Sequence, residues 1–164
     1  MSAGPPPGPL PEGGADRKVR IRVGAVIIRH GEILLVKHEK DGRTYWLLPG
    51  GGLEYGETMA QALERELMEE CGLKVRAGHL LFVAESLPPD QHRQVLNMTF
   101  LAELLEGEAH LAEKDSERLK GVAWVKKSAV AGLTFFPDFR DSLLAQWDCD
   151  FQLQAESLGN LWKD

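Results

Sequence analysis

The chain has 164 residues, of which 43% are hydrophobic and 27% charged, and its formal net charge is −6. This length suits one domain with a hydrophobic core, and the acidic balance argues against extended nucleic-acid binding because it repels phosphate backbones. A small phosphorylated ligand held through a metal ion remains compatible with it. No apolar run approaches the roughly 18 residues of a membrane span, and the N-terminus lacks the apolar segment of a secretory signal. Two cysteines without a CxxC spacing predict a reduced, cytoplasmic setting.

Composition divides the chain into three parts. Residues 1–16 are rich in Pro and Gly and predict a disordered tail, residues 17–150 form the expected domain, and residues 151–164 are a tail whose structure the sequence leaves undetermined. Alternating and apolar runs predict strands at 18–29, 33–38, 45–48, 79–86, 95–107 and 121–125. Turn and polar signals predict a hairpin turn at 30–32 and loops at 39–44, 87–94 and 108–120. Helices are expected at 59–71, 128–133 and 136–147, the last with Pro137 in its first turn. Strands on both sides of a central helix predict a mixed α+β fold.

The central helix has signals at both ends. Thr58 and Gln61 have the spacing of a capping box, which satisfies two backbone N–H groups at a helix start. Gly72 follows Cys71 and is suited to the left-handed conformation that ends many helices. The sequence therefore predicts a helix of fixed length in the middle of the domain.

Three carboxylates occupy one face of this helix. Glu66, Glu69 and Glu70 stand at i, i+3 and i+4. On a helical wheel, Met59, Leu63, Leu67 and Cys71 define the buried stripe, Glu70 falls within it, and the other two acids lie along its edge. An acidic helix face is ordinarily just solvated, but buried carboxylates must be paired or bound to a metal.

Nearby basic residues are too few to neutralise these acids. Arg65 reaches Glu69 at i+4 and Lys74 lies beyond Gly72, so one arginine faces three carboxylates. Hard divalent cations would neutralise them, since Mg²⁺ takes oxygen ligands and keeps several waters. Three successive glycines, Gly50, Gly51 and Gly52, would let the backbone approach a ligand or ion closely.

Residues 51–73 read G-x5-E-x7-R-E-L-x-E-E-x-G-L, and this segment resembles the Nudix box at every fixed position. The matching residues are Gly51, Glu57, Arg65, Glu66, Leu67, Glu69, Glu70, Gly72 and Leu73. The order of elements over residues 18–147 is also similar to a Nudix domain. The resemblance implies a mixed β-sheet sandwiched between α-helices, and hydrolysis of the pyrophosphate bond of nucleoside diphosphates linked to another group.

The resemblance also implies roles for individual residues. Glu66, Glu69 and Glu70 would be ligands of Mg²⁺ or Mn²⁺, with the carbonyl of Gly50 as a further ligand. Arg65 would orient a glutamate through a salt bridge, and Glu57 would support the loop and the metal shell. Metal ions would neutralise the pyrophosphate and activate a water.

The general base is left open between two residues. In some relatives a box glutamate serves, which here points to Glu69. In others an acid from the loop after the long strand serves, which points to Glu117.

Marks outside the box bear on the substrate. Pro89 lies 16 residues after Leu73, a spacing that resembles the ADP-ribose pyrophosphatase subgroup. Candidate base-stacking aromatics are Tyr45, Trp46, Phe82 and Phe100, and Gly51 and Gly52 are candidate substrate contacts. Three functions stay open: a hydrolase of ADP-ribose or a related nucleotide sugar, a (d)NTP pyrophosphohydrolase, and a nucleotide-sensing module without catalysis. The expected partner is a small nucleoside diphosphate derivative, with no extended nucleic acid and no membrane, and a homodimer is left open.

Overall fold

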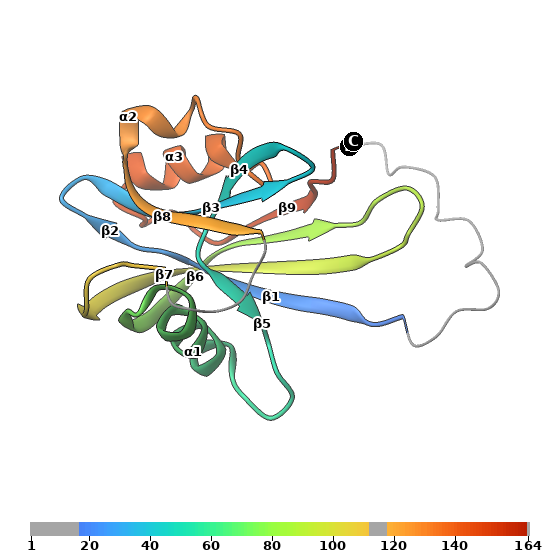
Figure 1. Ribbon diagram of the computed structural model, residues 1–164, viewed down its shortest axis with the longest axis horizontal. Coiled ribbons are helices and arrows are strands. Elements are labelled where there is room, and N and C mark those ends of the chain that lie inside the picture. Colours follow the sequence, from blue (N-terminus) through green and yellow to red (C-terminus); the bar gives the residue numbers. More distant parts are fainter. Residues whose placement is uncertain (1–16, 112–117, 164) are drawn as a thin grey trace.

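The computed structural model describes residues 17–111 and 118–163. Two β-sheets form its centre, with α1 (Met59–Cys71) on one side and α2 (Lys127–Val130) and α3 (Arg140–Asp148) on the other (Figure 1). The expected α+β arrangement, with mixed sheet between helices, is confirmed.

The larger sheet has five strands in the order β5-β1-β7-β6-β9. These are β5 (Gly50–Gly52), β1 (Val19–Val26), β7 (Gln94–Glu106), β6 (Lys74–Ser86) and β9 (Glu156–Asn160). The sheet is mixed, because β1 pairs with β7 and β6 with β9 in parallel, while the other neighbours are antiparallel.

The smaller sheet is antiparallel and is built around β3. It consists of β2 (Ile28–Arg29), β3 (Glu32–Lys40), β4 (Arg43–Leu47) and β8 (Leu119–Lys126), and β3 pairs with each of the other three. Two-residue turns at His30–Gly31 and Asp41–Gly42 connect the hairpins, and all four residues have positive φ. Such turns match the twist of the strands that they join.

Alternation along β1 directs its side chains to two different cores. Val23 and Ala25 pack with Leu63 and Leu67 of α1 in one buried cluster. Val26 belongs to a second cluster, which includes Leu143 of α3 and Phe139, the residue directly before that helix. Residues of β1 at odd positions therefore face α1, and those at even positions face the opposite layer.

Three expectations about the elements need correction. The loop predicted at 39–44 is only a turn, because the left-handed residues Asp41 and Gly42 let β3 and β4 pair up to it. The three successive glycines, which lie beyond the strand predicted at 45–48, make the edge strand β5, paired with β1. The last helix begins at Arg140 rather than at Phe136, because the backbone of Phe136 still donates to the carbonyl of Trp46 at 2.9 Å.

The segment after Trp147, which the sequence left undetermined, includes β9. This strand adds to the outer edge of the larger sheet next to β6. The backbone N–H of Leu161 continues the pairing by donating to the carbonyl of Glu85 at 2.9 Å. The larger sheet thus depends on residues close to position 160.

Candidate functional site

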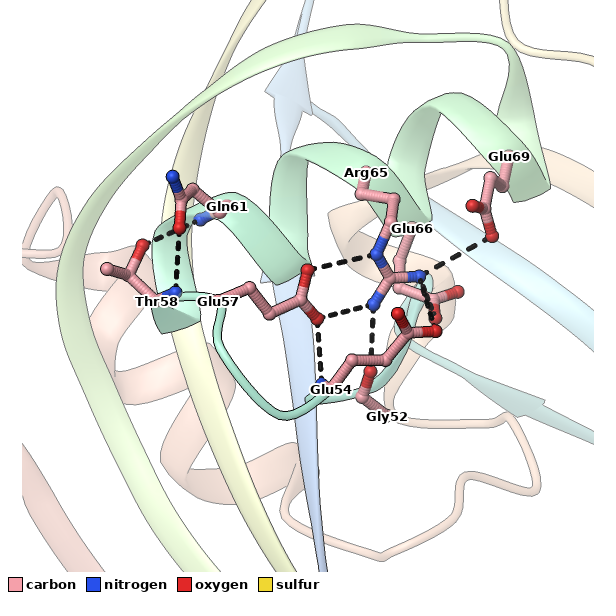
Figure 2. A network of polar contacts seen from close by, with 8 residues as sticks. All are labelled: Gly52, Glu54, Glu57, Thr58, Gln61, Arg65, Glu66 and Glu69. Carbon is pink, nitrogen blue, oxygen red and sulfur yellow. Dashed lines mark hydrogen bonds and ion pairs between the residues drawn. The ribbon is translucent and has the colours of Figure 1, made fainter.

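Helix α1 is fixed at both ends by the residues that the sequence indicated. Thr58 Oγ1 accepts from the backbone N–H of Gln61 at 3.2 Å, and Gln61 Oε1 accepts from the N–H of Thr58 at 2.8 Å, so the capping box is confirmed (Figure 2). Gly72 ends the helix with φ 66°. The acidic face is therefore held in a defined register against β5.

Burial along α1 differs from the wheel in two respects. Leu63, Leu67 and Cys71 are fully buried, but Met59 is 38% exposed. Its turn follows the exposed residues of the 54–58 loop, so it receives little cover from the sheet. The wheel placed Glu70 within the buried stripe and Glu66 at its edge, but Glu66 is the most deeply buried acid at 9% exposure and Glu70 is half-buried.

Arg65 is the centre of the polar network beside β5 (Figure 2). Its Nε and Nη2 donate to the two carboxylate oxygens of Glu57 at 3.1 and 2.6 Å, and Nη2 also donates to the carbonyl of Gly52 at 3.0 Å. Nη1 donates to Glu66 at 2.8 Å and lies 3.5 Å from Glu69 Oε2. The fork of one guanidinium thus joins the glycine strand, the loop before the helix and the acidic face.

Glu57 also fixes the loop that leads into the helix. Its Oε1 accepts from the backbone N–H of Glu54 at 2.8 Å while it binds Arg65. The Arg65 hydrogen bond is the main reason that the pKa of Glu57 is lowered from its ordinary value. In turn, the bond to Glu57 is the main reason that the pKa of Arg65 is raised.

The glycines of β5 allow the acids to approach the backbone. The N–H of Gly50 donates to Glu70 Oε1 at 3.1 Å. A Cβ at Gly51 would overlap the carboxylate of Glu66, whereas a Cβ at Gly50, where φ is 148°, would overlap the backbone carbonyl oxygen of Val23 in β1. A side chain at Gly51 would therefore displace the acidic face from the strand, and a side chain at Gly50 would separate β5 from β1.

The donor set suits a hard divalent cation, because it consists of carboxylates beside a backbone strand. In the part of the chain that the structure describes, however, no three His, Cys, Asp or Glu side chains converge as metal ligands would. The carboxylates of Glu57, Glu66 and Glu69 point toward Arg65 instead, and Glu70 toward Gly50. Metal binding would therefore require the acids to rotate from these partners.

Two arginines near the site did not emerge from the sequence. Arg20 and Arg22 stand two apart on β1, on the face that Gly24 shares and that points away from α1. The Arg20 guanidinium lies beside Gly52, and Arg22 Nη2 donates to the carbonyl of Leu48 at 2.8 Å. The period-two alternation of residues 18–24 was the available signal, since it already placed both side chains on one face.

Arg22 lines a small pocket that includes parts of β1, β7 and the segment before α3. Other lining residues include Asn97, Thr99, Phe136 and Pro137. Asn97 is buried and its Nδ2 donates to Ser86 Oγ at 3.2 Å, and Thr99 is 4% exposed. The pocket therefore combines a cation, buried polar groups and an aromatic ring.

The remaining sequence candidates lie in different places. Tyr45 contacts the rings of His38 and Phe136, with centroids 5.6 and 6.2 Å apart, so it is close to this pocket. Phe82 is buried against Phe139 in the core. Trp46 and Phe100 are partly buried and pack against the two hydrophobic clusters.

Two further candidates lie outside both the network and the pocket. Pro89 is exposed in the loop between β6 and β7 and does not line the pocket beside Arg22. Glu117 lies outside the described residues.

Burial shifts the pKa of two other side chains near the site, Cys71 and His38. The pKa of the Cys71 thiol is raised to about 12, chiefly by desolvation and then by Glu70, so this thiol is protonated and unreactive at neutral pH. The pKa of His38 is lowered, first by burial and then by Arg22 and Arg118, and its Nε2 is a buried atom without a hydrogen-bond partner.

Comparisons with known proteins bear on both the family and the fold. The family model described as NUDIX domain matches residues 18–146. In the described residues, no helix is long and apolar enough to cross a membrane. A solved structure titled NUDIX hydrolase from Nitrosomonas europaea has a TM-score of 0.70, with 24% identity over 90% of this chain and 81% of that one.

Two curated relatives have more specific names. The 8-oxo-dGDP phosphatase NUDT18 of Danio rerio is 37% identical over 65% of this chain, which corresponds to 32% of the relative. The ADP-ribose pyrophosphatase of Methanocaldococcus jannaschii is 32% identical over 59% of this chain and 58% of the relative. The matches thus span about a third and somewhat over half of these two proteins.

Proposed function

The chain belongs to the NUDIX domain family, and we propose that it is a metal-dependent pyrophosphohydrolase that cleaves the diphosphate bond of a nucleoside diphosphate derivative. One observation carries the proposal. Glu66, Glu69 and Glu70 stand beside the glycine strand β5, where Arg65 and Glu57 hold the loop and the helix together.

Members of this family generally use divalent metals, and the oxygen donors here suit Mg²⁺ or Mn²⁺. Glu66, Glu69 and Glu70 would hold the ion, with the carbonyl of Gly50 as a further ligand. Such an ion neutralises the diphosphate and lowers the pKa of a bound water. Arg65 then orients Glu66, and Glu57 orients Arg65.

A proton must leave the attacking water during hydrolysis. Glu69 is the first candidate to accept it, because it is the most exposed of the three acids and its side chain is 40% accessible. Glu117 is the alternative. Comparison of kcat for Glu69→Gln and Glu117→Gln tests the assignment, and a larger loss in Glu117→Gln would transfer the role to that residue.

ADP-ribose or another nucleotide sugar is the proposed substrate. Support comes from the spacing of Pro89 after Leu73 and from the archaeal relative named as an ADP-ribose pyrophosphatase. Pro89, Tyr45, Gly51 and Gly52 are the proposed substrate contacts. The expected products from ADP-ribose are AMP and ribose 5-phosphate, released in a cytoplasmic setting.

A second candidate is hydrolysis of (d)NTPs or modified nucleotides. The relative named 8-oxo-dGDP phosphatase, at 37% identity, favours it. A nucleotide-sensing module without catalysis is a third reading, and the presence of all three acids argues against it. Homodimer formation is left open in each case.

A substrate panel tests these functions against one another. Full-length protein is assayed with Mg²⁺ against ADP-ribose, nucleotide sugars, dNTPs and 8-oxo-dGDP, and kcat/KM is compared because discrimination is a ratio of these values. ADP-ribose or a nucleotide sugar should be preferred. A preference of about tenfold for any nucleoside di- or triphosphate, roughly 1.4 kcal/mol, would overturn the substrate assignment.

A variant on the acidic face tests the chemistry. Glu70→Gln should lower kcat by at least about 100-fold, as expected for loss of a major electrostatic group. Glu64→Gln is the matched control, because Glu64 is exposed on the same helix and accepts from the backbone of Ala77 instead. Near-full activity of Glu70→Gln, or of the unmodified protein in EDTA, would contradict the proposal.

A further inference from the structure

We infer that Arg22 binds a phosphate group of the substrate, at the face of the glycine strand opposite to the acidic helix. This inference rests on the proposed function for its choice of substrate. It concerns a residue outside the motif that carries the acids, on β1 rather than on α1.

The position of Arg22 follows from the alternation of β1. Val23 and Ala25 pack against α1, so Arg22 and Gly24 point to the other face of the same sheet. Arg22 pairs with Gly52 and Gly24 with Gly50, so β5 lies directly alongside. Since β5 is an edge strand of three glycines, no side chain of that strand stands between Arg22 and the acids.

The two arginines at this strand differ in how their donors are used. Arg65 makes four hydrogen bonds, to Glu57, Glu66 and Gly52, and is also near Glu69. Arg22 makes one, to the carbonyl of Leu48, and within residues 17–111 and 118–163 it has no carboxylate partner in an ion pair. A guanidinium has five N–H donors, so most of those on Arg22 remain for a ligand.

Arg22 is also partly removed from water. Desolvation is the main influence that lowers its pKa, and Glu70 and Glu66 oppose this effect at longer range. A guanidinium stays charged in proteins, and a desolvated charge is stabilised by an anion in contact. If a metal ion neutralises the acids of α1, Arg22 loses part of the favourable interaction with their negative charge. A substrate phosphate next to Arg22 would replace that negative charge.

The pocket beside Arg22 has a volume of about 10 Å³, which is room for one water-sized group, so a single phosphate oxygen can enter it while the rest of the anion stays at its mouth. Its walls include Arg22, Asn97, Thr99 and Phe136. A planar guanidinium fork matches two oxygens of one phosphate. A substrate that extends over the edge of β5 can therefore meet the acids of α1 on one side and Arg22 on the other.

The absence of a side chain at Gly24 leaves space for the Arg22 guanidinium. A Cβ at position 24 would lie 3.2 Å from Arg22 Nη1, closer than an ordinary contact, so the guanidinium would have to shift by a few tenths of an ångström. Gly24→Ala therefore shifts the Arg22 guanidinium slightly while keeping its charge. This variant tests whether the position of the guanidinium matters when its charge is retained.

The test is calorimetric titration of the full-length protein with methylenediphosphonate, a diphosphate analogue with a P–C–P bridge, in excess Mg²⁺. Arg22→Gln should weaken binding at least about tenfold, as expected for lost hydrogen bonds to a charged group. Arg22→Lys should lose less, because it retains the charge without the fork. Gly24→Ala should also bind more weakly than the unmodified protein.

Arg76→Gln is the matched control, because Arg76 is an exposed strand residue paired with Glu103. It should leave the affinity unchanged, and the melting temperature of each variant shows whether it folds. Should Arg22→Gln fail to fold, Arg22→Lys and Gly24→Ala decide the outcome. Equal affinity in all folded Arg22 and Gly24 variants, or no binding by the unmodified protein, would overturn the inference.

Kinetics separate this inference from the proposed function. On any substrate that the protein hydrolyses, Arg22→Gln should raise KM at least about tenfold and change kcat little, as for loss of uniform binding. Hydrolysis with an unchanged KM in Arg22→Gln would overturn the role of Arg22 and leave the proposed function standing. If the diphosphonate binds in a way that depends on Arg22 but no substrate is hydrolysed, the role of Arg22 stands and the proposed function is overturned.

Discussion

Gly51 lies directly against the carboxylate of Glu66, so that a single methyl group at position 51 would overlap the acid. The contact joins the edge strand β5 to helix α1, and Arg65 holds both by binding Glu66 and the carbonyl of Gly52. Strand and helix therefore approach as closely as backbone and carboxylate allow. The placement of the acidic face depends on the absence of one Cβ.

Gly51→Ala should thus impair both catalysis and stability. The methyl group forces Glu66 from its place, and we expect kcat to fall at least about tenfold, with destabilisation of about 1–3 kcal/mol from overpacking. Gly132→Ala is the control, because a Cβ there meets its nearest neighbour at an ordinary 3.7 Å. The measurements are kcat and the urea midpoint of unfolding for both variants. If Gly51→Ala matches Gly132→Ala in both, the contact between position 51 and Glu66 is not needed.

Replacement of Arg65 by lysine should disconnect the network. Lysine keeps the charge but cannot bind both oxygens of Glu57 and the carbonyl of Gly52 together. We expect kcat to fall and the melting temperature to drop by a few degrees, compared with Arg76→Lys at an exposed pair. Equal kinetics and melting in the two variants would argue against a positioning role for Arg65.

Added Mg²⁺ should raise the melting temperature of the full-length protein. A ligand that binds only the native state stabilises it by RT ln(1 + [L]/Kd), about 2.7 kcal/mol at 100 times Kd. Glu66→Gln should shrink the shift, whereas Glu64→Gln, on the same helix, should retain it. A melting curve that does not change across millimolar Mg²⁺ would contradict the proposed metal site.

Acidification should destabilise the protein through His38. Burial lowers its pKa in the folded state below the ordinary 6.5, so the unfolded chain binds this proton more readily than the native one. Its contribution to stability is present above the ordinary pKa and is lost progressively as the pH falls below it. The melting temperature should therefore fall more between pH 7.5 and 5.5 in the unmodified protein than in His38→Gln.

His30→Asn is the control for His38→Gln, because it also removes one histidine but does so at an exposed turn residue with positive φ. Asparagine tolerates that backbone conformation. The variant should keep the full pH dependence, and an equal pH dependence in His38→Gln would exclude His38 as its source.

Features that depend on local sequence were predicted well. The capping box of Thr58 and Gln61, the end of α1 at Gly72 and the alternation of β1 follow from interactions within a few residues, and all are present. The acids of α1 were also placed correctly on one face. The wheel missed the exposure of Met59 and the deeper burial of Glu66 than of Glu70, since burial depends on what lies across from the helix.

Features that depend on distant partners were not predictable in the same way. β5 has three glycines, which have low strand propensity, and it forms because β1 offers an open edge. β9 is short and largely exposed, and it forms by pairing with β6. The place of Arg22 beside the glycine strand depends on the pairing of β1 with β5.

The parallel pairs of the larger sheet bear on how the chain folds. Val19 of β1 pairs with Gln94 of β7, and Phe82 of β6 pairs with Glu156 of β9, so both ladders join segments far apart in the sequence. Such contacts require closure of long loops before they contribute stability, and a high contact order slows folding. During synthesis, β1 must wait for β7, and β6 must wait for β9, with their edges open in the meantime. Folding should therefore be slow for a chain of this size, and most prone to aggregation before residue 160 has emerged from the ribosome.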